Sequence, residues 1–531
     1  MLSTDSRFLF ALIIGENWYI LKISIKKGKE AMLLEQARID FHKLQKRIAA
    51  FNHAAELIYF DGETSAPPGT AGNRVQALEV LNEKLLILKG GPESLELITF
   101  LDENREWLSV KERRSLDFLL REIKRKQNIP PEEYGRYGAI LSEAQALWHS
   151  AREENDFKIL APKLEEVVNK LREFAKYNAP EKDPYNYCIE QYEEWLDVET
   201  LDEIFDSIKG EIAELLKAIK ERPQVDDTCL KGDFSEETLQ ELALFILELV
   251  GIDLDQVGLT TAAHPFTISL GSHFDERIAT RYSTDNLASS LYTILNQGGH
   301  ALYETGQADN LAYTVLDGAA SLSLTEGQGR FYENIIGRSR AFIEYIYPDL
   351  VELFPIPVGS YSPEEIYRAV NKVEAGPTRI NSDELTFNLH VIVRYELEKA
   401  MLHGDLSVRD LPDAWNQKYR EYLGVEVKDD LSGVLQDIHW PFGSFGYFPL
   451  YVLGNVFGAQ ITQKMNEEIS IYDYVEEGDF ERINSWNKNK IWKYGGLFTS
   501  KEIMEKYVGV SISGDALTNY LKNKYTEIYG L

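Results

Sequence analysis

The chain has 531 residues, of which 44% are hydrophobic and 27% are charged, a balance that excludes a disordered or fibrous protein. Its formal net charge of −30 repels a phosphate backbone and disfavours anionic membrane surfaces. We therefore expect neither nucleic acid nor a membrane as a partner. The length fits two or three average domains, and equally one large helical domain.

The first 31 residues are expected to contain neither a membrane helix nor a secretory signal. The apolar run that begins at Phe8 is far shorter than the ~20 residues of a membrane helix, and it lacks the flanking residues of a secretory signal. The segment Lys26 to Ala31, directly before Met32, has the composition of a ribosome-binding site read as protein. Residues 1–31 are therefore either a spurious or disordered extension before a start at Met32, or a short natural extension.

Cysteine usage is sparse. The two cysteines, Cys188 and Cys229, stand far apart in the sequence with no paired spacing. This pattern supports neither a disulfide framework nor a thiolate metal cluster. We expect plain thiols, which suit a reducing compartment, and we predict a cytoplasmic protein.

Apolar residues recur at three- and four-residue steps almost throughout the chain from Leu33 onward, which is the spacing of amphipathic helices. Clear examples are Phe41, Leu44, Ile48 and Phe51, and then Leu201, Ile204, Phe205, Ile208 and Ile212. Breaks that contain proline and glycine separate these runs, and they mark helix ends more than domain ends. Residues 32–531 are therefore predicted to form a single, mostly α-helical domain.

Residues 264–282 are the exception to the helical pattern. The runs His264 to Ser269 and Arg277 to Tyr282 have the composition of extended segments. They predict a short β hairpin, which we expect to lie beside a cleft.

The run at 287–304 predicts a helix with an inward apolar face, and it places Asn296 and His300 four residues apart on one face. Zinc peptidases use this geometry. In an H-E-x-x-H helix the two imidazoles bind the metal, and the Glu takes a proton from the bound water. Here the sequence reads N-Q-G-G-H from Asn296 to His300, so only the second imidazole is present.

Four further motifs accompany this helix, two complete and two partial. The complete ones are H-P-F at residues 264–266 and G-x-x-Q-D-x-H-W at residues 433–440. The partial ones are D-x-R-x-T at residues 275–279 and I/V-R-x-x-A-D at residues 378–383. From about Met32 to its C-terminus the chain therefore resembles the carboxypeptidase Taq family of zinc metallocarboxypeptidases.

The resemblance implies an all-α, mostly helical metallocarboxypeptidase-like fold with a deep central cleft and a small β hairpin or sheet beside the site. It also implies a homodimer and a zinc cofactor. The three metal ligands of the family fall on Asn296, His300 and Glu326, and its general base falls on Gln297. His300 and Glu326 keep the expected identities, whereas Asn296 and Gln297 do not, and Thr325 replaces the His of the family's H-E-S/G-Q.

The two replacements at the metal turn weaken two different steps. An amide oxygen is a weak ligand for zinc, which in catalytic sites has three good protein ligands and a water. A neutral Gln297 accepts no proton, and general-base assistance is worth about 10²–10⁴-fold. We therefore predict a carboxypeptidase Taq-like protein with weakened or lost zinc-dependent hydrolysis of C-terminal amino acids, with a peptide-binding or regulatory role.

The resemblance also assigns substrate-binding positions. A carboxypeptidase must hold a free C-terminal carboxylate, which a guanidinium binds in a bidentate manner, and this role falls on Arg379. Asp437 and His439 are expected either to form a buried hydrogen-bonded pair that shapes the cleft or to act directly. The same two roles stay open for His264, while Arg277 is expected to be structural within the hairpin.

Two other hypotheses remain open. In the first, the protein is an active metallocarboxypeptidase in which His273, Asp437 or His439 supplies the missing ligand and base. Otherwise His273 is expected to be a surface histidine. In the second, the protein is a non-catalytic structural subunit, for which a cleft filled by side chains would be the sign.

Overall fold

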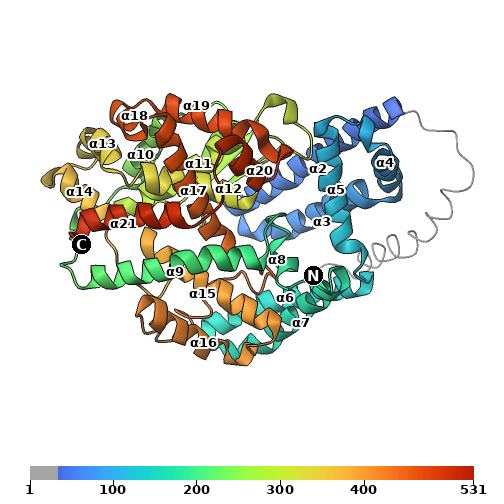
Figure 1. Cartoon of the computed structure of the whole chain (residues 1–531), viewed down its shortest axis with the longest axis horizontal. Coiled ribbons are helices and arrows are strands. Elements are labelled where there is room, and N and C mark those ends of the chain that lie inside the picture. The colour runs from blue at the N-terminus through green and yellow to red at the C-terminus, as the bar shows by residue number, and fades with distance from the viewer. Residues whose placement is uncertain (1–33) are drawn as a thin grey trace, which may run out of the picture.

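The computed structural model describes residues 34–531. Helices dominate this part of the chain, and one small sheet accompanies them. This architecture confirms the predicted fold class, while the predictions for residues 1–31 lie outside the described residues. Figure 1 shows an elongated molecule in which the first helices of the chain form one end.

The N-terminal helices have a hydrophobic cluster of their own, which includes Phe41, Ile98 and Leu116. These helices are α2 (Leu34–Thr64), α3 (Ala71–Gly90), α4 (Pro92–Glu103) and α5 (Val110–Gln127). The ring of Phe60 on α2 also meets the ring of Phe266, with 6.0 Å between the centroids. This aromatic contact attaches the N-terminal helices to the predicted hairpin.

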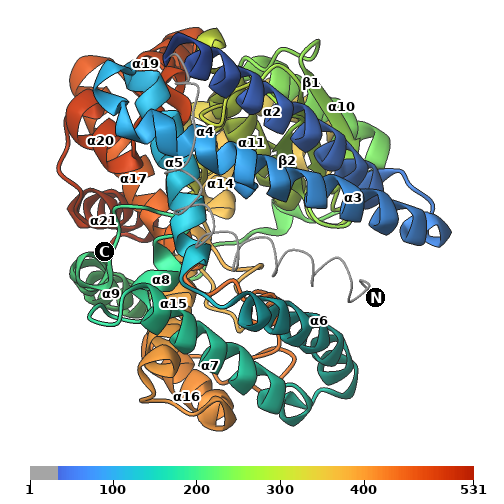
Figure 2. The ribbon, with the colours of Figure 1, turned by 90° about the vertical axis from the view of Figure 1, so that its right-hand side faces the viewer.

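A second group of helices lies together in the lower half of Figure 2. Its members are α6 (Pro131–Glu154), α7 (Ala161–Asn178), α8 (Asn186–Ile189), α9 (Val198–Lys220), α15 (Glu384–His403) and α16 (Leu411–Lys418). The predicted apolar stripe of α9, from Leu201 to Ile212, is buried, and α9 packs against α15. The stripe therefore forms part of the main core, as its helical spacing predicts.

The helix predicted at 287–304 is α11 (Leu287–Thr305). The remaining α-helices of the described chain are α10 (Glu236–Leu249), α12 (Leu322–Arg330), α13 (Arg340–Leu353), α14 (Pro363–Val370), α17 (Pro449–Glu468), α18 (Ile471–Glu477), α19 (Phe480–Lys490), α20 (Ser500–Glu502) and α21 (Asp515–Tyr529). Helix α12 packs against both α11 and α17, and it continues into the π-helical segment η6 (Phe331–Ile336). Residues of α12 and η6 are thereby held against α11.

The sheet has the strand order β1-β3-β2, with β1 (Val257–Thr261), β2 (Phe266–Ser269) and β3 (Glu276–Thr280). Strands β2 and β3 pair antiparallel, which confirms the predicted hairpin. Strand β1 pairs parallel with β3 on its other side. The sequence pattern does not predict β1, because its partner is not the next strand along the chain and the pairing is decided by tertiary contact.

Capping side chains fix where the two site helices begin. Asn286 accepts a hydrogen bond from the Ser289 N–H at the start of α11, and Ser321 accepts one from the Leu324 N–H at the start of α12. Each cap satisfies a backbone N–H that a helix start otherwise leaves without a partner. The caps therefore set the positions from which the site residues follow.

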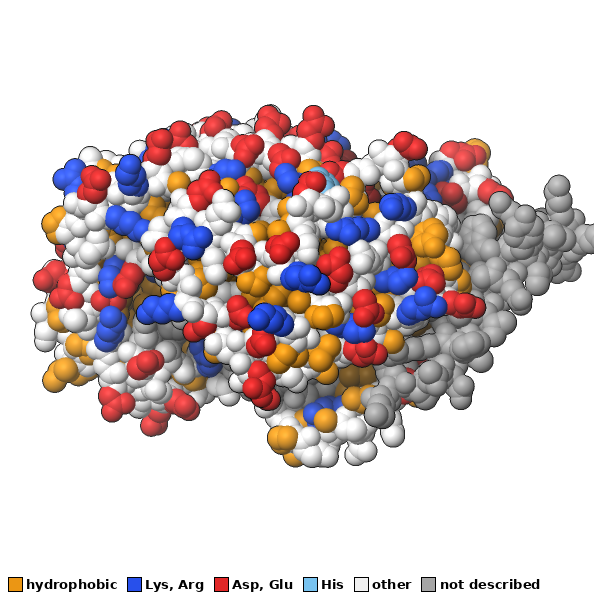
Figure 3. Space-filling model, turned by 90° about the horizontal axis from the view of Figure 1, so that it is seen from below, with side chains coloured by type: hydrophobic (Ala, Val, Ile, Leu, Met, Phe, Trp, Pro, Cys, Tyr) orange, Lys and Arg blue, Asp and Glu red, His pale blue; other side chains and the backbone are white. Residues whose placement is uncertain are grey.

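No helix of residues 34–531 is both long enough and apolar enough to span a membrane. Acidic and basic side chains are interspersed over the face shown in Figure 3. Both cysteines are buried free thiols, as predicted. Burial raises the pKa of the Cys229 thiol to about 12, so this group stays protonated and unreactive at neutral pH.

Candidate functional site

Helix α11 carries Asn296 and His300 one turn apart, and the backbone of α12 lies directly against this turn. Glycine makes the approach feasible, because a Cβ on Gly299 would lie 2.6 Å from the carbonyl oxygen of Gln328. Real Cβ contacts are longer than this, so only a residue without Cβ fits here. The two helices that carry the predicted metal ligands are therefore in backbone contact.

Asn296 and Gln297 belong to one chain of hydrogen bonds. Thr267 Oγ1 donates to Gln297 Oε1 at 2.7 Å, and Gln297 Nε2 donates to Asn296 Oδ1 at 3.0 Å. Asn296 Nδ2 then donates to Glu333 Oε2 at 3.0 Å. The same carboxylate oxygen accepts from Arg330 Nη1 at 2.8 Å. Because an ionised carboxylate can only accept hydrogen bonds, the atom of Asn296 that faces Glu333 is the amide nitrogen. The Asn296 oxygen is thereby turned toward Gln297.

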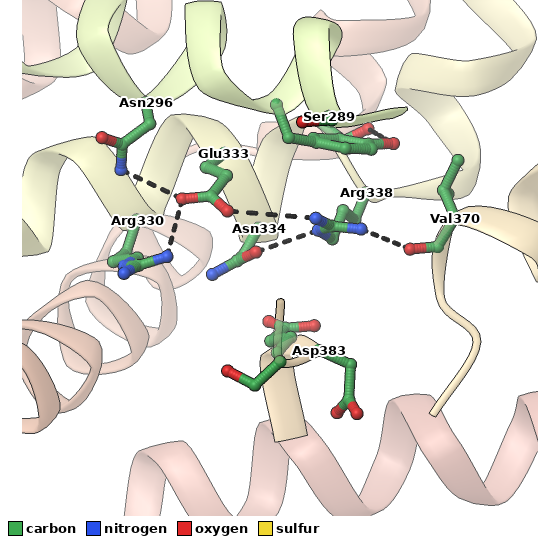
Figure 4. Close-up of polar contacts among 12 residues, drawn as sticks. Ser289, Asn296, Arg330, Glu333, Asn334, Arg338, Val370 and Asp383 are labelled. Carbon is green, nitrogen blue, oxygen red and sulfur yellow. Dashed lines mark hydrogen bonds and ion pairs between the residues drawn. The ribbon is translucent and has the colours of Figure 1, made fainter. Parts of the chain in front are cut away.

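Glu333 is the centre of this arrangement, as Figure 4 shows. Asn296 and Arg330 bind its Oε2, and Arg338 Nη2 lies 3.9 Å from its Oε1. The Glu333 side chain is only 13% exposed. A largely buried carboxylate is stable when cations and donors surround it, and here one amide and two guanidinium groups do so.

His300 is half-buried one turn after Asn296. A Cβ on Gly329 would lie 2.7 Å from His300 Nε2, so the absence of a side chain there makes room for the imidazole. Burial, and after it the nearby Arg330, lowers the pKa of His300 to about 4, which leaves the ring neutral at pH 7. Its Nδ1 is buried and has no hydrogen-bond partner among the described residues. Nδ1 of His300 is therefore not engaged by a hydrogen bond of the described chain.

Glu326 on α12 is the other retained ligand position. It is half-buried, and its carboxyl group makes no hydrogen bond within the described part of the chain. Burial raises the pKa of Glu326 to about 7, although Arg330 opposes the shift. The preceding residue, Thr325, donates its hydroxyl to the carbonyl of Ser321 at 3.1 Å, so it stays within the helix.

Replacing Glu326 by Gln is expected to stabilise the protein at pH 8 and not at pH 5. The pKa of Glu326 rises on folding from 4.5 to about 7. Its ionisation therefore lowers the free energy of unfolding as the pH rises above 4.5, and the loss is complete above about pH 7. We expect about 1–3 kcal/mol from a shift of this size in a half-buried group. Denaturant unfolding at the two pH values measures it.

Glu365→Gln is a control of opposite sign for this measurement. Hydrogen bonds from Ser362 lower the pKa of the Glu365 carboxyl, so its contribution to stability is present at high pH and lost on acidification. A Glu326→Gln effect that is equal at pH 5 and pH 8 would contradict the prediction.

The donors at this turn do not fit a three-ligand zinc site. Catalytic zinc normally has three good protein ligands and an open position. Within residues 34–531, no three His, Cys, Asp or Glu side chains come together so that they could hold a metal ion. The oxygen of Asn296 accepts from Gln297, which leaves His300 and Glu326 as the donors at the predicted positions. Two donors remain where zinc requires three.

A cavity of about 610 Å³ opens beside the turn. The residues on its wall that concern the site are Asn296, Gln297, Arg330, Glu333 and Arg379. His300 and Glu326 are not among the residues that line it. The structure thus brings the two replaced positions and the predicted carboxylate-binding arginine to one space, and it leaves the two retained ligand positions outside that wall.

Arg379 is held at the cavity wall by Asp437. Its Nε and Nη2 donate to Asp437 Oδ1 at 3.3 and 2.8 Å, while Arg394 Nε donates to Asp437 Oδ2 at 2.7 Å. Burial alone would raise the pKa of Asp437, but Arg394 and Arg379 hold it well below its ordinary value. Arg379 Nη1 makes no hydrogen bond within the described residues. Asp437 therefore orients Arg379 and leaves one of its amines free.

His439 is not hydrogen-bonded to Asp437, which contradicts the predicted pair. Its ring instead packs on Phe448, with 4.4 Å between the centroids, and its Nδ1 is buried without a hydrogen-bond partner among the described residues. Burial lowers the pKa of His439 to about 4. Both carboxylate oxygens of Asp437 are engaged by arginines, while the aromatic contacts of His439 hold its ring against Phe448.

His264 and Arg277 lie at the sheet. His264 is exposed, and its neighbour Pro265 lines the cavity, so His264 stands beside the cavity wall. Arg277 Nε donates to Asp275 Oδ1 at 2.7 Å. This bond links Arg277 in β3 to Asp275, the residue directly before the strand.

The prediction that His273 lies at the surface is wrong. The residue is 2% exposed, and its Nδ1 lies 2.6 Å from Asp317 Oδ1. A buried imidazole needs a polar partner, and Asp317 provides it from a distant part of the sequence. Asp317 engages Nδ1 only, and Nε2 is buried without a hydrogen-bond partner among the described residues. His273 nevertheless belongs to no group of three metal-binding side chains within residues 34–531.

Three charged residues complete the site although no motif singles them out. Two of them, Arg330 and Glu333, follow Glu326 by four and seven residues. This spacing places Glu326, Arg330 and Glu333 on one helical face. That spacing is the sequence signal that points to them. Arg394 is 0% exposed, and a cation within the apolar run of α15 is its only signal, since arginine is rarely buried without a partner.

The chain is similar to known carboxypeptidases over most of its length. The family described as Carboxypeptidase Taq (M32) metallopeptidase matches residues 40–525. Carboxypeptidase 1 of Bacillus subtilis (strain 168) is 33% identical over 492 residues, which cover 92% of this chain and 98% of that protein. Thermostable carboxypeptidase 1 of Pyrococcus furiosus is 32% identical over 487 residues, which cover 90% and 96%.

Solved structures show the same relationship. The crystal structure of an M32 carboxypeptidase from Deinococcus radiodurans R1 matches with a TM-score of 0.90 and 30% identity, covering 93% of this chain and 100% of that one. Metallocarboxypeptidase 1 of Trypanosoma cruzi matches with a TM-score of 0.88 and 29% identity, covering 92% and 99%. The resemblance predicted from the motifs is therefore confirmed, and the chain belongs to the carboxypeptidase Taq (M32) family of metallopeptidases.

Proposed function

We propose that the protein is a carboxypeptidase Taq-like protein in which zinc-dependent hydrolysis is weakened or lost, while the binding of peptide C-termini is retained. The observation that carries the proposal is the hydrogen-bond chain through Asn296 and Gln297. The oxygen at the first ligand position accepts from Gln297, and Gln297 itself is bound to Thr267. A general base must accept a proton from the attacking water, and a side-chain amide has no site for one.

Arg379 is the proposed anchor for the C-terminal carboxylate. Asp437 orients the guanidinium through Nε and Nη2, and Nη1 has no partner among the described residues. The cavity of about 610 Å³ that Arg379 lines has room for the end of a peptide. An open cavity with polar walls supports ligand binding over the purely structural subunit, for which a filled cleft is expected.

Metal content and hydrolysis, measured on the same purified protein, test the loss of catalysis. We expect far less zinc than one ion per chain and no steady release of C-terminal amino acids from peptides. Stoichiometric zinc together with steady release would overturn the proposal.

Calorimetry with two peptides of one sequence, with free and with amidated C-termini, tests the binding role. We expect the amidated peptide to bind about tenfold more weakly, because it lacks the charge-assisted hydrogen bonds of a carboxylate. Equal affinity of the two peptides would overturn the binding role and leave the proposed loss of catalysis standing.

We also propose a homodimer in the cytoplasm. The dimer is taken from the family resemblance, and the buried free thiols suit a reducing compartment. Light scattering on the purified protein tests the dimer, and the mass of a single chain would contradict it.

A further inference from the structure

Arg330 stands on the cavity wall with hydrogen-bonding capacity that the protein leaves unused. Its Nη1 donates to Glu333 Oε2 at 2.8 Å. Its Nε is buried without a partner, and its Nη2 makes no hydrogen bond within residues 34–531. The side chain is 18% exposed and lines the cavity of about 610 Å³. Nη2 is therefore the donor of this guanidinium that is left for a ligand.

Three other cations, Arg338, Lys372 and Arg379, line the same cavity wall. Arg338 donates to the backbone carbonyl of Val370, as Figure 4 shows, and Lys372 Nζ lies 2.7 Å from a carboxylate oxygen of Glu374. Arg338 also donates through Nε to Asn334, and its Nη2 lies 3.9 Å from Glu333 Oε1. Arg379, by contrast, keeps a free amine at Nη1. Arg330 and Arg379 thus face one cavity, each with a donor that makes no hydrogen bond within the described residues.

An aromatic pair sets the spacing of these two groups. The guanidinium of Arg330 lies over the ring of Phe387, 4.3 Å from its centroid, and that of Arg379 lies over the ring of Tyr451 at 5.4 Å. The two rings meet edge to face with 5.8 Å between their centroids. Contact with an aromatic face holds a guanidinium in one orientation. The cavity therefore presents two fixed guanidinium groups, one beside each ring, and each is paired on its other side with a carboxylate of the protein.

The two guanidinium groups line the same cavity and are joined through the contacting rings of Phe387 and Tyr451. A ligand with two negative groups can interact with both cations at the same time.

We infer that Arg330 is a specificity-determining residue that binds the side-chain carboxylate of an acidic C-terminal residue, Asp or Glu, while Arg379 binds its main-chain carboxylate. The inference rests on the proposed binding of peptide C-termini and names the class of peptide. Each carboxylate would accept charge-assisted hydrogen bonds from one guanidinium. A peptide with an uncharged terminal side chain would leave Nη2 of Arg330 unpaired beside the ligand, which disfavours its binding.

Calorimetry with two tetrapeptides that differ only in a terminal Glu or Gln tests the inference on the full-length protein. We expect the Glu-ended peptide to bind about tenfold more tightly to the wild type. In the Arg330→Gln variant this ratio should fall below about twofold. Arg330→Lys keeps the charge but loses the planar pair of amines, so it should give an intermediate ratio.

Arg340→Gln is the matched control, because it removes the same charge from a pair with Glu527 outside this cavity, and it should leave the ratio unchanged. Equal affinity of both peptides for the wild type would overturn the inference, as would an unchanged ratio in Arg330→Gln. If Arg330→Gln does not fold, an unchanged ratio in Arg330→Lys overturns it. In each case weaker binding of an amidated peptide would still support the proposed function, whereas equal binding of free and amidated peptides would overturn that function itself.

Discussion

Replacing Asn296 by His together with Gln297 by Glu is expected to restore zinc binding and peptide hydrolysis. The new imidazole adds a third donor to His300 and Glu326, which is the number that a catalytic zinc site normally has. The new carboxylate adds a proton acceptor, and such an acceptor is worth about 10²–10⁴-fold in rate. Zinc content per chain and release of a C-terminal amino acid measure the two effects on one sample.

The single replacements separate metal affinity from proton transfer. Asn296→His alone should raise the zinc content with little hydrolysis, because the base is still missing. Gln297→Glu alone should give little of either. Glu326→Ala in the doubly replaced protein should remove both again, since it takes away a donor. Zinc binding without hydrolysis in the double variant would contradict the prediction that the rest of the site is intact.

Asp437→Asn is expected to lower the free energy of unfolding by about 3–5 kcal/mol, the cost of removing one partner of a buried ion pair. The change leaves Arg394, which is 0% exposed, and Arg379, which is 11% exposed, without a carboxylate. Asparagine has nearly the volume of aspartate, so the loss reports on charge and not on a new cavity. Urea unfolding of the two proteins measures the difference.

Asp275→Asn is the control for this measurement. Asp275 pairs with Arg277 at a similar distance, 2.7 Å, but the two side chains are 34% and 38% exposed. Exposed pairs contribute about 0–1 kcal/mol. Losses of equal size in the two variants would show that burial of the Asp437 cluster is not what makes it important.

The sequence by itself determined the helices and the identity of the replaced residues. Helical spacing is a local property, so the stripe from Leu201 to Ile212 is buried as predicted, and the helix predicted at 287–304 is observed as Leu287–Thr305. The positions of Asn296 and Gln297 within the family motif are likewise a matter of sequence alone. The family and the mostly helical fold follow from these local features.

The tertiary structure alone decided which polar groups meet. Asn296 binds Glu333, His273 binds Asp317, and the oxygens of Asp437 are occupied by arginines and not by His439. A buried polar group takes whichever partner the packing of distant segments brings within about 3 Å, and a one-dimensional motif does not contain that distance. Arg379 could be predicted because it belongs to a family motif. The role inferred for Arg330 could not, because it depends on which donors the folded chain leaves unused.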